Sequence, residues 1–233
     1  MAVASKNLFH FTSQYDTLVK ILEGKAFWPR YCCEYDWFTD KSKVMSIPMV
    51  CFTDIPLVQT SEHVDFYGHY GIGLTKTWAS SKFVCPVWYV KQKTLRIILN
   101  VTSNTDALKD PHIIDILTFS KHATRGRCKN RSGDIKQKEF YEEREWRYVP
   151  PVVDKKKLIV GKIGETLGNN EDTKSFLLSY SLGDIRYLLV DTEEDRLNLI
   201  NDIDRIFSST ETQESIALLK SRILTIEQLK QDF

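Results

Sequence analysis

The alternation of hydrophobic and polar positions predicts a chain that opens with a strand followed by a helix. Aromatic residues dominate Leu8–Thr12, and such a run is typical of a strand. Apolar residues then recur at helical spacing until Gly24, and Ser13 or Asp16 can cap the helix that this spacing indicates. The same reasoning predicts further strands at Ile47–Thr53, His69–Thr75 and Val84–Val90, and short helices at Leu57–Phe66 and Thr77–Ser81.

Longer stretches with weaker patterns lie between these elements. Lys25–Ser46 is rich in aromatic and charged residues of mixed periodicity, which predicts an ordered loop with short pieces of regular structure. Lys91–Leu117 is amphipathic enough for one or two helices, whereas Ser120–Lys138 is polar and basic and predicts a loop. Tryptophan and tyrosine at a period of two within Glu139–Val149 predict a strand there.

The C-terminal third of the chain predicts the order strand, helix, helix, strand, helix. The continuous apolar run Ile185–Val190 is typical of a buried strand. A helical stripe covers Asp195–Ile206, and a second helix is predicted over Ser215–Lys220. A short strand over Arg222–Thr225 then leads into a capping box formed by Thr225 and Gln228, which predicts a last helical turn.

Composition narrows the class of protein. The chain has 233 residues, of which 42% are hydrophobic and 12% aromatic, so most of it is expected to fold into one large domain or one domain with an appendage. No apolar run is long enough to span a bilayer and the N-terminus lacks a signal-peptide core, which predicts a protein of the cytoplasm. The five cysteines form no CxxC pair, so we expect free thiols and no metal site.

The net charge of +1 conceals an asymmetry along the chain. Residues 170–233 hold 7 basic and 13 acidic residues, a net charge of −6, which leaves 25 basic and 18 acidic residues and a net charge of +7 for the rest. The basic body is therefore compatible with a polyanionic partner, and the acidic tail is a candidate for docking a partner protein.

Candidate chemistry lies first in the strand that contains His10. This side chain faces away from the two flanking phenylalanines, and Thr12 with Ser13 adds hydroxyls beside it, although a lone histidine is more often structural. Asp54 stands before a proline, where a turn-forming role is commoner than a ligand role. The two glycines in His69–Thr75 mark a bulge or the close approach of a backbone or a ligand.

A charged strand and a basic run supply the other candidates. On a strand, Glu143, Glu145 and Arg147 line one face. This face is either a salt-bridged ladder, or it presents a carboxylate that holds a ribose or stabilises a developing cation. The run Lys121–Arg131 is either a solvated loop or a grip for phosphates. Its basic members are Lys121, Arg125, Arg127, Lys129 and Arg131.

Taken together, these segments resemble the AbiGi family of abortive phage-infection proteins, a family described as an antitoxin. The resemblance rests on LFHFT with its helix, FTDIP, HYGIGLTK and EREWR, and it covers roughly Leu8 to Val149 together with the closing ILTIEQLKQDF.

More distantly, the layout is similar to ADP-ribosyltransferases of the DarT and diphtheria-toxin type. That resemblance implies that NAD is the substrate, that no metal is needed, and that a late strand carries the catalytic glutamate. It places Glu145 as the catalytic residue and Glu143 as the residue that orients the acceptor, with these two roles open to exchange. It further assigns His10, Thr12, Tyr70 and Arg30 to NAD. The charge of the basic run favours nucleic acid as the acceptor, so this run and Arg147 are the expected acceptor contacts.

These resemblances lead to an α+β fold, with a mainly antiparallel, split sheet surrounded by helices and a C-terminal strand-helix appendage. The expected domains are 1–165, which is ADP-ribosyltransferase-like, and 166–233, the appendage packed on it. The protein is expected to be a mono-ADP-ribosyltransferase of a bacterial phage-defence or toxin–antitoxin system. It would transfer ADP-ribose from NAD to a nucleic acid or a protein. The alternatives are a non-catalytic antitoxin or interaction module that binds a cognate partner, and a regulatory protein that binds a nucleotide.

Overall fold

The computed structural model describes residues 5–59, 61–94, 97, 110–130, 132–152 and 157–232. The chain divides into two compact units, each made of several segments. The first combines residues 1–27, 52–82 and 179–233, and the second combines residues 28–51 and 83–178. No helix among the described residues is both long and apolar enough to cross a membrane. The division into 1–165 and 166–233 stays a prediction.

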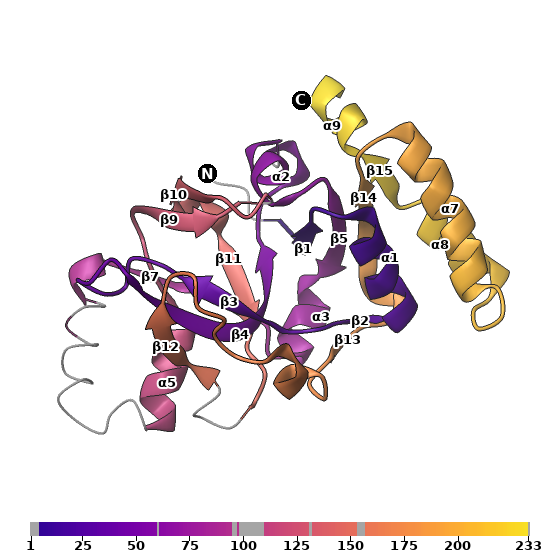
Figure 1. The fold of residues 1–233 in the computed structure, drawn as a ribbon. Helices are drawn as coiled ribbons and strands as arrows, with labels where there is room; N and C mark the ends of the chain where they lie inside the picture. The colour runs from indigo at the N-terminus through magenta and orange to yellow at the C-terminus, as the bar shows by residue number, and fades with distance from the viewer. Residues whose placement is uncertain are drawn as a thin grey trace. The chain divides into compact units, whose positions relative to one another are not determined.

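The first unit is built on a mainly antiparallel sheet with the order β15-β14-β5-β1 (Figure 1). Strand β5 lies between β1 and β14 and runs antiparallel to both, while β15 runs parallel to β14. The strands are β1 (Asn7–Thr12), β5 (Tyr70–Thr75), β14 (Ile185–Val190) and β15 (Ile223–Thr225). Their alternating side chains place Phe9, Ile72 and Leu188 in the core, where each is almost wholly buried.

Helices of the first unit pack against this sheet and against each other. Helix α1 contacts both β5 and α7, and α7 also contacts β14 and β15. The helices are α1 (Tyr15–Gly24), α2 (Ser61–Tyr67), α3 (Lys76–Ser81), α7 (Glu193–Phe207), α8 (Gln213–Lys220) and α9 (Ile226–Asp232). Short pieces complete the unit: β2 (Ala26–Phe27), η1 (Leu57–Gln59) and η5 (Leu182–Asp184).

The second unit is centred on the long strand β4 (Lys43–Thr53), whose last two residues belong to the first unit. Strands β3 and β12 pair antiparallel with β4, and β11 lies between β4 and β6. These partners are β3 (Arg30–Glu34), β6 (Cys85–Pro86), β11 (Glu145–Tyr148) and β12 (Ile159–Lys162). Trp37, Met45 and Ile47 are fully buried in the apolar cluster beside β4.

Two small sheets and short helices complete the second unit. Strands β9 (Arg125–Lys129) and β10 (Ile135–Glu139) form an antiparallel hairpin, and β7 (Trp88–Val90) pairs with β8 (Ser120–His122) in parallel. The remaining elements are α5 (Pro111–Thr118), η3 (Phe140–Glu143), η4 (Asn170–Thr173) and β13 (Leu178–Ser179), whose second residue belongs to the first unit.

The predicted α+β class with mainly antiparallel sheets is confirmed, but three local predictions differ from the structure. Ser120–Lys138 forms three strands rather than a loop. Hydrogen bonding to neighbouring strands stabilises them, and a polar sequence does not reveal such pairing. The first half of Glu139–Val149 is a 3₁₀ turn, and the strand begins only at Glu145. Lys25–Ser46 has more regular structure than the predicted ordered loop with short pieces, since it contains β2, β3 and the start of β4.

The glycines of β5 admit aromatic rings of the neighbouring strand. A Cβ atom added at Gly73 would lie 2.7 Å from Cε1 of Phe9, and one at Gly71 would lie 3.1 Å from Cδ1 of Phe11. Phe9 in turn packs on Tyr187, with 5.8 Å between ring centroids. The close approach predicted at these glycines is therefore that of the protein's own core.

We expect Gly73→Ala to destabilise the protein by about 1–3 kcal/mol, because the added methyl group overpacks the site that the Phe9 ring fills. Urea denaturation gives the difference in the free energy of unfolding. Gly24→Ala serves as the matched control, since nothing lies within 4 Å of a Cβ there, and it should change stability by no more than about 1 kcal/mol. Equal effects of the two substitutions would contradict this role of the glycines.

Candidate functional site

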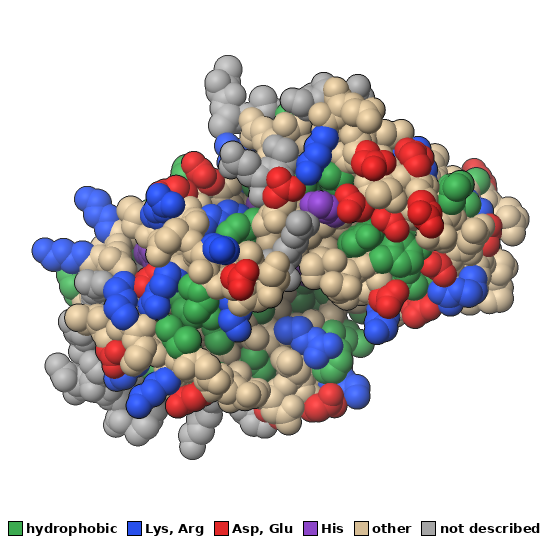
Figure 2. All heavy atoms as spheres, turned by 45° about the horizontal axis from the view of Figure 1, so that its top comes forward, with side chains coloured by type: hydrophobic (Ala, Val, Ile, Leu, Met, Phe, Trp, Pro, Cys, Tyr) green, Lys and Arg blue, Asp and Glu red, His purple; other side chains and the backbone are tan. Residues whose placement is uncertain are grey.

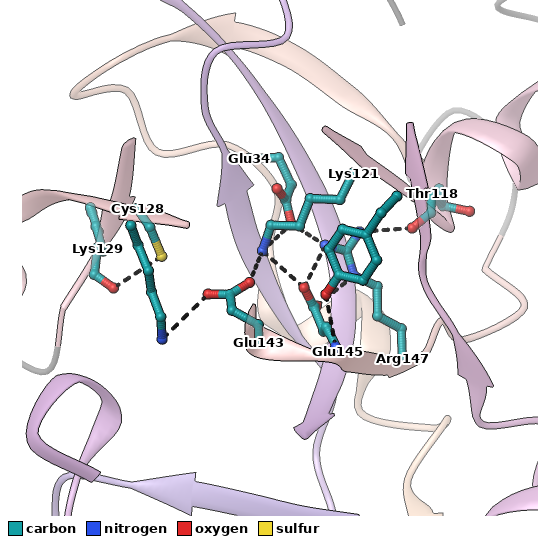
Figure 3. A network of polar contacts seen from close by, with 10 residues as sticks. Glu34, Thr118, Lys121, Cys128, Lys129, Glu143, Glu145 and Arg147 are labelled. Atoms are coloured by element: carbon teal, nitrogen blue, oxygen red, sulfur yellow. Dashed lines mark hydrogen bonds and ion pairs between the residues drawn. The ribbon is translucent and has the colours of Figure 1, made fainter. Parts of the chain in front are cut away.

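Five charged side chains of the second unit meet in its interior (Figure 3). They come from segments far apart along the chain: the end of β3, the middle of β8, the end of η3 and the strand β11. Each is less than a tenth exposed. The five residues, which we call the buried ion network, are Glu34, Lys121, Glu143, Glu145 and Arg147.

Lys121 lies between the two glutamates that the sequence singled out. Its Nζ donates to Oε2 of Glu143 at 2.7 Å and to Oε2 of Glu145 at 2.9 Å, and it lies 4.0 Å from Oε1 of Glu34. The same ammonium group is 4.4 Å from the centroid of the Phe140 ring, a cation–π contact. One buried cation therefore neutralises several carboxylates and keeps them together.

Arg147 binds the other side of Glu145 through a bidentate pair. Its Nε donates to Oε1 at 2.6 Å and its Nη2 donates to Oε2 at 3.1 Å. The same Nη2 also donates to Oε1 of Glu34, and Nη1 donates to the carbonyl oxygen of Thr118 at 2.9 Å. This planar, fully buried guanidinium thus joins β11, β3 and the end of α5.

The local backbone explains how neighbouring residues reach one centre. Strand alternation turns Glu145 and Arg147 inward and leaves Trp146 and Tyr148 only partly buried. Glu143 precedes the strand, and Arg144 between them has a φ of 43°, in the left-handed region. Glu145 and Arg147 share one face of β11, as predicted. Glu143 lies before the strand, so the left-handed turn at Arg144, and not strand alternation, brings its side chain to the same centre.

The opposite charges of Glu145 and Lys121 favour the ionised form of each other. Burial alone would raise the pKa of Glu145, but Arg147 and Lys121 outweigh it and hold that pKa well below its usual range. Burial alone would lower the pKa of Lys121, and the adjacent Glu143 and Glu145 instead raise it well above its usual range. Glu145 thus accepts hydrogen bonds as a carboxylate.

Neighbouring residues make further contacts with the glutamates of the network. The backbone N–H of Glu145 donates to the hydroxyl oxygen of Tyr89 at 2.8 Å, and Nζ of Lys138 lies 3.7 Å from Oε1 of Glu143. Burial raises the pKa of the Cys51 thiol well above its usual value, which leaves it uncharged at neutral pH. Within the described part of the chain, no cluster of His, Cys, Asp and Glu has the arrangement that a metal ion requires.

Three residues assigned to NAD by resemblance belong to the first unit, whereas the buried ion network belongs to the second. His10 packs against the rings of Phe27 and Phe52, with centroids 5.0 Å and 5.8 Å away. Thr12 ends β1 directly opposite Tyr70 on β5, and the Tyr70 hydroxyl donates to Oδ2 of Asp195 at 3.1 Å. These contacts give His10 and Tyr70 roles in packing and in hydrogen bonding.

The remaining predicted residues belong to the second unit. The guanidinium carbon of Arg30 lies 3.4 Å from the centroid of the Trp28 ring. Lys121 of the basic run is buried in the ion network, whereas Arg125 and Lys129 are exposed on the β9–β10 hairpin. Arg127 binds Asp36, with 3.0 Å between its Nε and Oδ1. The predicted residue Arg131 lies outside the described residues.

The sequence reasoning missed Glu34, and it placed Lys121 on a surface loop. Glu34 lies in a stretch of mixed periodicity that gave no signal of a strand or of an inward side chain. Near Lys121, the apolar residue Phe119 lies two residues earlier in the sequence. It is compatible with a strand at Lys121, but it is equally compatible with a loop. Their meeting with Glu145 depends on pairing between distant strands.

We expect Arg147→Met to lower the free energy of unfolding by about 3–5 kcal/mol, because it leaves Glu34 and Glu145 buried with one cation fewer. The matched control is Arg125→Met, which removes an exposed arginine and should stay within about 0.5 kcal/mol of the wild type. Chemical denaturation measures both. A cost below about 1 kcal/mol for Arg147→Met would show that the network is not needed for stability.

Acid should destabilise the protein in two steps. Burial lowers the pKa of His122 below its usual value of 6.5, so the unfolded chain binds a proton first and the free energy of unfolding falls as the pH drops below about 6.5. The lowered pKa of Glu145 adds a second loss below about 4.5, where unfolded glutamates become protonated. Urea denaturation across this range measures both steps. His122→Phe, which keeps a ring against Phe140, should remove only the first step.

Comparisons with known proteins bear on the resemblance to the AbiGi family. Residues 25–191 match the model of a family described as "Putative abortive phage resistance protein AbiGi, antitoxin". The chain is also 27% identical over 249 residues to the abortive phage resistance protein AbiGi of Lactococcus lactis subsp. cremoris, across 89% of this chain and 100% of that protein. No solved structure matches the chain. Because the family model covers well over half of the sequence, this chain belongs to the AbiGi family of abortive phage resistance proteins.

Proposed function

We propose that this protein acts in abortive phage resistance as an antitoxin, which binds a cognate toxin protein and catalyses no reaction of its own. Membership of the AbiGi family supports the role in phage defence, and the family's description supports the role of antitoxin. The state of the two candidate catalytic glutamates supports the absence of catalysis.

The observation that carries this proposal is the pairing of Glu143 and Glu145 with buried cations. Their side chains are only 4% and 7% exposed, and Lys121 donates to both. A carboxylate that stabilises a developing positive charge must reach the substrate and must not already be neutralised. Arg147 and Lys121 occupy the Glu145 oxygens from two sides, so the network has the features of a structural element.

The rival function is the ADP-ribosyltransferase implied by the more distant resemblance. It requires Glu145 to hydrogen-bond a ribose hydroxyl, and the Lys121 and Arg147 contacts would have to be exchanged for that bond. Breaking a buried, charge-assisted pair is expensive unless a new partner replaces it at once. The transferase is therefore the second candidate, and substitution of Glu145 separates the two.

The acidic C-terminal helices are the surface that we assign to the toxin. Glu194 on α7 and Glu214 on α8 are exposed, and neither forms an ion pair with another described residue. Leu197 and Leu218 on the same helices are 63% and 52% exposed. Acidic side chains (red) gather on this part of the first unit in Figure 2. Such a surface complements a basic partner that also offers apolar side chains.

Co-expression with a candidate toxin tests the proposal in growing cells. We expect the wild-type protein to relieve the growth arrest caused by the toxin, and the purified protein to release no nicotinamide from NAD. Glu194→Lys combined with Glu214→Lys should abolish the relief, because it reverses two charges on the docking surface. The control pair Glu139→Lys and Glu142→Lys makes the same change of charge at exposed residues of the second unit and should leave relief intact.

Glu145→Gln decides between the two functions. Release of nicotinamide by the wild type and its loss in a folded Glu145→Gln protein would establish the transferase and contradict our proposal. Relief of toxicity that is unchanged by the double variant at Glu194 and Glu214 would instead contradict the assigned surface.

A further inference from the structure

The β9–β10 hairpin presents a regular array of cations that the proposed antitoxin function does not use. Residues 121–139 contain seven basic and two acidic residues. The second unit as a whole holds 21 basic and 15 acidic residues, a net charge of +6, whereas the first unit holds 11 and 16, a net charge of −5. Positive charge is therefore concentrated in the unit that carries this hairpin.

The inner face of the hairpin is fixed to the body of the second unit. A Cβ atom added at Gly126 would lie 2.4 Å from the His122 ring and 2.5 Å from the Phe140 ring, so the hairpin packs closely on both. Asp36 holds the hairpin from the side, since its Oδ2 accepts the backbone N–H of Arg127 at 2.7 Å. Lys138 turns inward toward Glu143. These contacts orient the hairpin and leave its other face outward.

The outward face carries side chains typical of nucleic-acid contact. Strand alternation puts Arg125, Arg127 and Lys129 on one face of β9, with successive members about 6.8 Å apart along the strand. On β10 the same face has Glu139, Gln137 and Ile135 opposite them. Arg125 and Lys129 are exposed and form no ion pair within the described part of the chain. Two cations thus flank an arginine anchored on Asp36.

We propose that this outward face of the β9–β10 hairpin binds duplex DNA, with Arg125 and Lys129 on the phosphates and Gln137 directed at base edges. A two-stranded antiparallel ribbon fits the major groove, which is about 12 Å wide. Arginine and lysine bind phosphates without regard to sequence, and glutamine is suited to the edge of adenine. The rigid attachment of the inner face lowers the entropic cost of binding.

The composition of the face favours DNA over an acidic protein. The centre of a protein interface is usually depleted of charge and enriched in aromatic anchors. Here the outward face has cations at regular intervals, and Ile135, 40% exposed, is its one apolar side chain among the paired residues of the hairpin. In Figure 2, Lys and Arg side chains (blue) are frequent on the exposed face of the second unit. A linear polyanion such as DNA can place one phosphate against each cation of this face.

Fluorescence anisotropy with the full chain and a labelled DNA duplex tests the proposal. We expect binding at about 50 mM salt that weakens steeply by about 200 mM, because counterions are released from the phosphates. Arg125→Gln combined with Lys129→Gln should weaken binding about tenfold or more at low salt, and it should reduce the slope of log affinity against log salt by about 0.9 for each phosphate that is no longer neutralised. Lys6→Gln with Lys20→Gln removes two exposed lysines of the first unit and should change affinity less than about twofold.

Three results would overturn the proposal. The first is the absence of hairpin-dependent DNA binding, seen either as equal affinity of the hairpin variant and the wild type or as no binding of the wild type at low salt. The second is equal or tighter binding of polyglutamate, which would indicate an acidic protein as the partner. The third is tighter binding of a single-stranded RNA of equal length, which would exclude the major-groove geometry. Circular dichroism of both variants shows that each remains folded.

Discussion

The second unit depends on one buried contact, the bidentate pair between Arg147 and Glu145. Its guanidinium also reaches Glu34 and the carbonyl oxygen of Thr118, so a single side chain joins β11, β3 and the end of α5. Lys121 adds a second cation, which brings β8 and η3 to the same centre. Isolated buried charges are too costly to persist, and this set is tolerated because its members neutralise one another.

The same contact shapes the functional conclusion. A buried carboxylate is available for chemistry only if it is not already bound, and both oxygens of Glu145 accept hydrogen bonds from cations of the chain. The pair that resembles the glutamates of transferases therefore has the surroundings of a structural network. The proposed antitoxin function instead assigns binding to the surface, where the acidic helices α7 and α8 and the basic β9–β10 hairpin differ in charge and in the partners they suit.

Much of the fold follows from local pattern. The buried strand Ile185–Val190 and the helices that follow it were predictable because continuous apolar runs and helical stripes need no partner to be recognised. The hairpin Arg125–Glu139 was not predictable, since its polar residues carry no alternation of hydrophobicity and its strands are stabilised by each other and by Asp36. Within the candidate site, the shared face of Glu145 and Arg147 could be predicted from the sequence, because alternate residues of a strand point to the same side.

The sequence by itself determined the α+β class, the family and the residues in which charge is concentrated, because periodicity, motifs and composition are local properties of the chain. Only the tertiary structure decided which charges meet. Lys121 is a member of a basic run in sequence but a buried partner of Glu143 and Glu145 in space, while Arg125, four residues later, is exposed. The difference arises from strand pairing between distant segments, which buries some cations against carboxylates and leaves others in solvent.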